Sequence, residues 1–132
     1  MNKEFVLYEQ ALELKELGFD EPCFGYYHED KSLTYTDLVS QNTNSFWKIN
    51  KVITAPLYQQ IFKWFREKKL SDASINRHGE ADGRYSYRWE IVHENGVYEE
   101  RHFKMGYKTY EEAELACLRK LIEIVNNKKT EN

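Results

Sequence analysis

Histidines and neighbouring carboxylates are the residues of this sequence that could bind a metal ion or transfer protons. His28 and His78 each have acidic residues close by, but both lie in predicted turns, where polar side chains are common. No two of the histidines show the i, i+4 spacing with which a helix binds a metal ion. Glu99 and Glu100 point to opposite faces of a predicted strand. The sequence therefore predicts no metal site and no general acid–base pair.

The candidate nucleophiles are two cysteines, Cys23 and Cys117, which lie far apart in the sequence and form no CxxC pair. Cys117 falls in the apolar stripe of a predicted helix, where a thiol behaves as a small hydrophobe. No serine lies in a GxSxG motif, and no glycine-rich phosphate loop is present. We therefore expect no catalytic residue and no cofactor. An enzyme of unrecognised type, with a site assembled from distant segments, stays open as a third alternative.

Composition indicates a globular domain. The 132 residues include 19 Lys and Arg against 22 Asp and Glu, a formal net charge of -3, and 41% are hydrophobic. This hydrophobic content excludes a disordered tail. No run of apolar residues approaches the ~20 that span a bilayer, so no membrane partner is expected. Residues 1–5 open with charge and lack the apolar core of a secretory signal. We expect a cytoplasmic protein with both thiols reduced.

The net charge disfavours nucleic acid as a partner, although residues 38–108 carry 12 basic and 8 acidic groups. The order of a helix at 54–69, strands over 72–104 and a helix at 109–125 resembles the double-stranded RNA-binding domain. In that family lysines at the start of the last helix bind phosphates, whereas Glu111, Glu112 and Glu114 stand here. Stacking of single-stranded bases on aromatic side chains is still open as an alternative.

Three helices are expected from apolar periodicity. The first covers residues 3–17 and ends at Gly18, which suits a left-handed C-terminal cap. The second covers 54–69, with Thr54 as its cap. The third covers 109–125 and begins with a capping box, in which Thr109 bonds the amide of Glu112 and the Glu112 carboxylate bonds the amide of Thr109. Residues 126–132 are expected to form a frayed tail.

Strands are expected between these helices. Residues 23–27 and 32–35 predict a short hairpin, 46–53 a further strand, and 71–83 a strand followed by a loop. Residues 85–92 and 97–104 flank Asn95-Gly96, which favours a type I′ hairpin turn. With a two-residue loop, Glu90 would face Arg101 and Arg88 would face Phe103.

These elements predict an α+β fold. We expect residues 1–132 to form a single domain, in which an antiparallel sheet of three or more strands is covered on one face by about three helices. The sequence contains no internal repeat and no interdomain linker.

Three segments, Tyr8–Phe24, Ala55–Lys68 and Thr109–Leu118, resemble small proteins encoded by tailed bacteriophages and prophages of Bacteroidetes-type hosts. No activity is known for that group. The resemblance covers the helical motifs, about a third of the chain. It implies a cytoplasmic location inside an infected bacterium, and it implies no activity and no functional residues.

We expect a non-enzymatic phage-type accessory protein that binds another macromolecule, a protein in the leading hypothesis. Its ten tyrosines are more than a core of this size easily hides, and tyrosine is favoured at interfaces. The candidate partner-binding surface is the outer hairpin face, with Arg88, Glu90, Arg101 and Phe103. Its alternative interpretation is a local cross-strand salt bridge and cation–π pair. The alternative function is a single-stranded nucleic-acid-binding protein.

Overall fold

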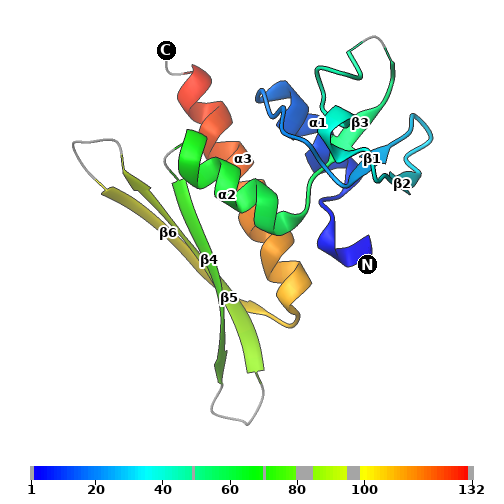
Figure 1. Ribbon diagram of the computed structural model, residues 1–132. Helices are drawn as coiled ribbons and strands as arrows, with labels where there is room; N and C mark the ends of the chain where they lie inside the picture. Colours follow the sequence, from blue (N-terminus) through cyan, green and yellow to red (C-terminus); the bar gives the residue numbers. More distant parts are fainter. Residues whose placement is uncertain (1, 49, 70, 80–84, 95–98, 131–132) are drawn as a thin grey trace. The chain divides into compact units, whose positions relative to one another are not determined.

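The computed structural model describes residues 2–48, 50–69, 71–79, 85–94 and 99–130 (Figure 1). The chain divides into two compact units, Met1–Gln60 and Ile61–Asn132, and the boundary falls inside helix α2 (Tyr58–Lys68). Each unit contains one three-stranded antiparallel sheet among its described residues. The predicted α+β class is confirmed, with the strands distributed over two sheets.

The first unit is built from short elements. They are a 3₁₀ turn at Asn2–Glu4, α1 (Tyr8–Glu16), β1 (Gly25–Tyr27), β2 (Leu33–Tyr35), a 3₁₀ turn at Val39–Gln41 and β3 (Ile53–Ala55). The strand order is β2-β1-β3, and the predicted hairpin between the first two strands is confirmed. Helix α1 contacts β3. The buried apolar residues of this unit are Phe5, Val6, Ala11, Leu14, Leu17, Phe19, Cys23, Tyr27, Ile53, Ala55 and Tyr58.

Two predictions for this unit are wrong. Residues 46–48 form a turn, and the third strand begins only at Ile53. Thr54, the predicted cap of the second helix, lies in β3 opposite Tyr26. Its amide donates to the side chain of Asn44 (3.0 Å), which lies in the preceding loop. The chain therefore pairs with β1 here, and α2 starts four residues later than Thr54, at Tyr58.

The C-terminal end of α1 agrees with the sequence analysis. Gly18 has φ of +96°, its amide donates to the carbonyl of Lys15 (3.1 Å), and the amide of Phe19 donates to that of Leu14 (3.0 Å). These two bonds are the Schellman motif, and Leu14 and Phe19 are both buried. The predicted cap is confirmed, although α1 begins at Tyr8 rather than at residue 3.

The second unit contains most of α2, followed by β4 (Ser71–Gly79), β5 (Tyr85–Glu94), β6 (Glu99–Tyr107) and α3 (Tyr110–Thr130). The strand order is β4-β5-β6. Helix α3 lies on one side of this sheet and contacts all three strands (Figure 1). The buried apolar residues of this unit are Ile61, Trp64, Phe65, Trp89, Ile91, Ala113, Cys117, Leu118, Leu121, Ile122, Ile124 and Val125.

The register of the β5–β6 hairpin differs from the prediction by two residues. Glu90 pairs with Phe103 and Arg88 with Met105, and the last described pair is Glu94 with Glu99. The predicted Asn95-Gly96 turn lies outside the described residues. Because side chains alternate with period two, a shift of two residues changes the partners and preserves the faces. Trp89 and Ile91 are buried as predicted.

Helix α3 begins and ends differently in detail from the prediction. The hydroxyl of Thr109 accepts from the amide of Glu112 (3.1 Å), as expected. The carboxylate of Glu112 accepts from the amide of Lys108 (3.3 Å) instead of that of Thr109. The helix continues to Thr130, so residues 126–130 of the expected tail are helical.

The left-handed cap of α1 gives the first prediction. Gly18→Ala should lower the free energy of unfolding by about 1 kcal/mol, because a Cβ is strained at this backbone conformation. Urea denaturation followed by circular dichroism measures the change. Gly18→Asn should lose less, since asparagine tolerates positive φ better than alanine does. An alanine variant as stable as the wild type would contradict this account of the cap.

Candidate functional site

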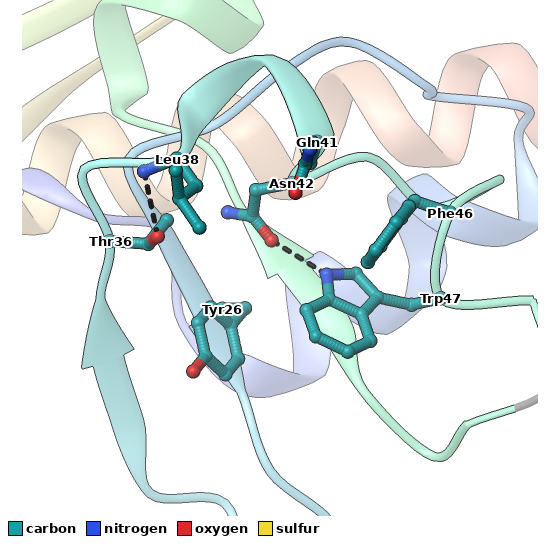
Figure 2. Close-up of a pocket in the computed structure, with 7 residues that line it drawn as sticks. All are labelled: Tyr26, Thr36, Leu38, Gln41, Asn42, Phe46 and Trp47. Atoms are coloured by element: carbon teal, nitrogen blue, oxygen red, sulfur yellow. Dashed lines mark hydrogen bonds between the residues drawn. The ribbon is translucent and has the colours of Figure 1, made fainter.

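A pocket in the first unit is the candidate site. It has a volume of about 230 Å³, and we call it the aromatic pocket. Figure 2 shows its lining: three aromatic rings, one leucine, one threonine and two side-chain amides. The residues are Tyr26, Thr36, Leu38, Gln41, Asn42, Phe46 and Trp47.

Local structure brings these side chains together from β1 and the loop that follows β2. Gly25 and Tyr27 are buried, so Tyr26 between them points to the opposite face of β1 and into the pocket. Two hydroxyls shape the loop. The Thr36 hydroxyl accepts from the amide of Leu38 (3.0 Å), and the Thr43 hydroxyl accepts from the amide of Phe46 (3.1 Å). Both are local side-chain to backbone bonds of the kind that form turns.

The side chain of Asn42 fixes the floor of the aromatic pocket. It is 3% exposed, and its amide nitrogen donates to the carbonyls of Cys23 and Gly25, both at 2.8 Å. Its amide oxygen accepts from the indole N–H of Trp47 at 2.7 Å (Figure 2). One buried amide therefore joins the loop to the strand region and sets the position of the largest ring in the pocket.

The rings themselves leave apolar surface open to solvent. The centroids of Tyr26 and Trp47 lie 5.4 Å apart at a tilt of 34°, and those of Phe46 and Trp47 lie 5.0 Å apart, edge to face. Phe46 is 55% exposed and Leu38 66% exposed. Exposed apolar side chains beside a pocket mark interaction sites more often than scattered ones do.

The lining of the aromatic pocket is uncharged and mostly apolar. None of its seven lining residues carries a formal charge at neutral pH. The hydroxyls of Thr36 and Tyr26 and the amide of Gln41 can orient a bound group, and Asn42 already bonds three partners. The volume of about 230 Å³ is below the ~300–1,000 Å³ of sites for drug-sized ligands, so the pocket suits a single side chain.

The residues predicted for partner binding lie in the second unit and come together there. Arg101 Nε is 2.9 Å from Glu90 Oε1, and the Arg88 guanidinium lies 5.7 Å from the centre of the Phe103 ring. These four residues, the outer hairpin face, lie opposite the side on which Trp89 and Ile91 are buried. The salt bridge and the cation–π pair of the alternative interpretation are confirmed. At this exposure such pairs contribute little to stability.

The histidines do not form a reactive centre in the parts of the chain that the structure describes. His28 bonds the hydroxyl of Thr34 (2.7 Å), and His93 Nδ1 bonds the hydroxyl of Ser71 (2.6 Å). Sequence reasoning did not pair Ser71 with His93, which are 0% and 3% exposed and so lie in the interior of the second unit. The side chain of His78 lies outside the described ones. No group of three His, Cys, Asp or Glu residues among those described could hold a metal ion.

Both cysteines are buried free thiols, as predicted for Cys117. Burial raises the pKa of Cys23 and that of Cys117 to about 12 each. The thiolate is the reactive form of cysteine, so neither side chain is a nucleophile at neutral pH.

The sequence does not predict the aromatic pocket, because a strand is expected at 46–53 and the structure forms a turn at Phe46 and Trp47. The available signal was the polar run at residues 40–45 followed directly by two aromatic residues. Such runs favour turns, and a turn can expose rings that a strand would pair.

No protein-family model matches the sequence, and comparisons with curated proteins and with solved structures give no match. Within the described residues, no helix has the length and apolarity needed to cross a membrane.

The buried amide gives the second prediction. Asn42→Ala should lower the free energy of unfolding by about 2–3 kcal/mol, because two carbonyls and an indole N–H lose their partner. Near-ultraviolet circular dichroism should also change as Trp47 loses its fixed position. Asn50→Ala is the matched control, since Asn50 is exposed, and it should be nearly neutral. Equal stability of the two variants would show that the amide does not hold the pocket.

The thiols give the third prediction. At pH 8 the folded protein should react with a thiol reagent far more slowly than the urea-unfolded protein, because both cysteines are buried and protonated. Each pKa rises from 9.0 to about 12 on folding. The stabilising effect of these thiols is therefore complete below pH 9 and is lost as the pH rises towards 12. Rapid labelling of the folded protein would contradict this assignment.

Proposed function

We propose that this chain is a non-enzymatic protein-binding protein, whose aromatic pocket accepts one apolar side chain from a short segment of a partner protein. The observation that carries the proposal is the uncharged pocket of about 230 Å³, lined by three rings and fixed from below by a buried amide. Aromatic residues in preformed pockets carry much of the binding energy at protein interfaces.

The construction of the pocket supports a preformed site. Trp47 is held by its bond to Asn42 (2.7 Å) and by its contacts with Tyr26 and Phe46. A ring that is already ordered loses little conformational freedom when a partner binds. The exposed side chains of Leu38 and Phe46 beside the pocket offer the partner further apolar contact.

Charge favours a protein over nucleic acid as the partner of this unit. Residues 1–60 carry 5 Lys and Arg against 9 Asp and Glu. A surface of this sign repels phosphates, although the rings could stack on bases. Single-stranded nucleic acid is therefore the alternative that the experiment must exclude.

We also propose a place of action, the cytoplasm of an infected bacterium, with the chain as an accessory protein of a tailed phage or prophage. The resemblance of its three helical segments to such proteins supports this. The two buried free thiols are compatible with a reducing compartment.

The fourth prediction tests the pocket. Linear peptides selected from a random library on the wild-type protein should share an apolar anchor residue. Their affinity, measured by titration calorimetry, should fall at least about tenfold in Phe46→Ala, because an anchor pocket loses a wall. Phe103→Ala is the matched control: the same residue type, 49% exposed against 55% for Phe46, on the outer hairpin face. It should leave the affinity within about twofold, as expected for a residue outside the site.

Three outcomes would count against the proposal. If both variants lowered the peptide affinity equally, the selected peptides would not use the aromatic pocket. If the selected peptides lacked an apolar anchor, the aromatic pocket would accept no apolar side chain. Tight binding of a single-stranded oligonucleotide that Phe46→Ala abolishes and that salt weakens steeply would favour the nucleic-acid alternative.

A further inference from the structure

A second concave surface lies in the other unit and has a different chemistry. Strand β6 and helix α3 border a groove with a volume of about 440 Å³. Lys104 contributes from β6, and Arg119 and Lys120 contribute from consecutive positions of α3. We call it the basic groove.

Positive charge exceeds negative charge in the basic groove. Glu123 is the acidic residue of its lining, and its Oε1 lies 3.4 Å from Lys120 Nζ. Lys104 and Arg119 are exposed, and no ion pair engages either of them within the described part of the chain. Two cations are therefore available to a ligand at this concave surface.

A hydroxyl is also available in the basic groove. The indole N–H of Trp89 donates to the hydroxyl oxygen of Tyr107 (3.2 Å). Since this bond uses a lone pair of the oxygen, the hydroxyl hydrogen of Tyr107 can be donated to a ligand. Trp89 is buried and pairs in the sheet with Lys104 of β6, so the hydroxyl is positioned by a side chain of the core.

We propose that the basic groove binds a small polyanion of the organic-phosphate class, up to the size of a nucleotide. Lys104 and Arg119 bind the anionic oxygens from the two sides of the groove, and the Tyr107 hydroxyl donates a further hydrogen bond. Charge-assisted bonds of this kind are stronger than neutral ones. The volume of about 440 Å³ falls in the ~300–1,000 Å³ range typical of small-molecule sites.

The surrounding charge favours a small ligand over a polynucleotide. Residues 61–132 carry 14 Lys and Arg against 13 Asp and Glu, so the excess of cations in the groove is local. Glu111 and Glu112 occupy the first turn of α3. A long phosphate backbone needs an extended basic surface, whereas one phosphate group needs only the groove.

The fifth prediction uses inorganic pyrophosphate and ATP as probes, titrated by calorimetry at low and high salt. We expect saturable binding that weakens at high salt and falls at least about tenfold in the double variant Lys104→Ala/Arg119→Ala. The matched control is Arg66→Ala/Lys68→Ala, which removes the same charge from exposed positions of α2 and should bind almost as the wild type does. Tyr107→Phe should weaken binding, because it removes the hydroxyl that donates to the ligand.

Several results would overturn the proposal. One is the absence of saturable binding of pyrophosphate and ATP at low salt. Another is an equal loss of affinity in the two double variants. A third is a single-stranded oligonucleotide that binds much more tightly than pyrophosphate or ATP. Circular dichroism of each variant separates loss of the site from loss of the fold. Because the aromatic pocket lies in the other unit, peptide binding by Lys104→Ala/Arg119→Ala reports on the proposed function separately.

Discussion

The hydrogen bonds of one buried amide determine the candidate site. Two backbone carbonyls and the indole N–H of Trp47 lose their hydrogen bonds to water on burial. The side chain of Asn42 provides hydrogen bonds to all three instead. An unpaired buried polar group is costly, so these three bonds stabilise the attachment of the loop to the strand region. The exposed rings of the aromatic pocket are therefore positioned by polar chemistry beneath them. The neighbouring Asn44 acts in the same way, since it bonds the carbonyl of Phe19 (2.8 Å) and the amide of Thr54 (3.0 Å).

The two surfaces differ because different forces build them. The aromatic pocket depends on a loop whose residues bond backbone groups of distant segments, and its lining is uncharged. The basic groove depends on regular elements. Strand β6 carries Lys104, and helix α3 carries Arg119 and Lys120. Binding residues often lie on loops that a rigid scaffold positions, as the rings of the aromatic pocket do. This difference supports a separate ligand class for each unit.

The β5–β6 hairpin shows how a wrong register can still give the right surface. The predicted register differs from the observed one by two residues, so each described cross-strand partner differs from the prediction. The four residues of the outer hairpin face nevertheless lie on one side, because the error was an even number of residues. Long side chains then bridge the diagonal positions, as Arg101 does to Glu90 and Arg88 to Phe103. Met105 pairs with Arg88 and Tyr107 pairs with Tyr87, so Gly106 is left over as the extra residue of a bulge. Its φ of +104° suits glycine.

The sequence by itself determined the α+β class, the cap at Gly18, the cap at Thr109 and the buried face of β5. Each depends on residues within a few positions of one another, where propensity and periodicity act directly. Tertiary structure alone decided the partners of Asn42, which lie 17 and 19 positions away, the position of β3, and the meeting of β6 with α3 at the basic groove. Those features depend on which backbone N–H and C=O groups still lack a hydrogen-bond partner after the local elements form. Such groups lie far apart in the sequence, so no local sequence pattern predicts how they pair.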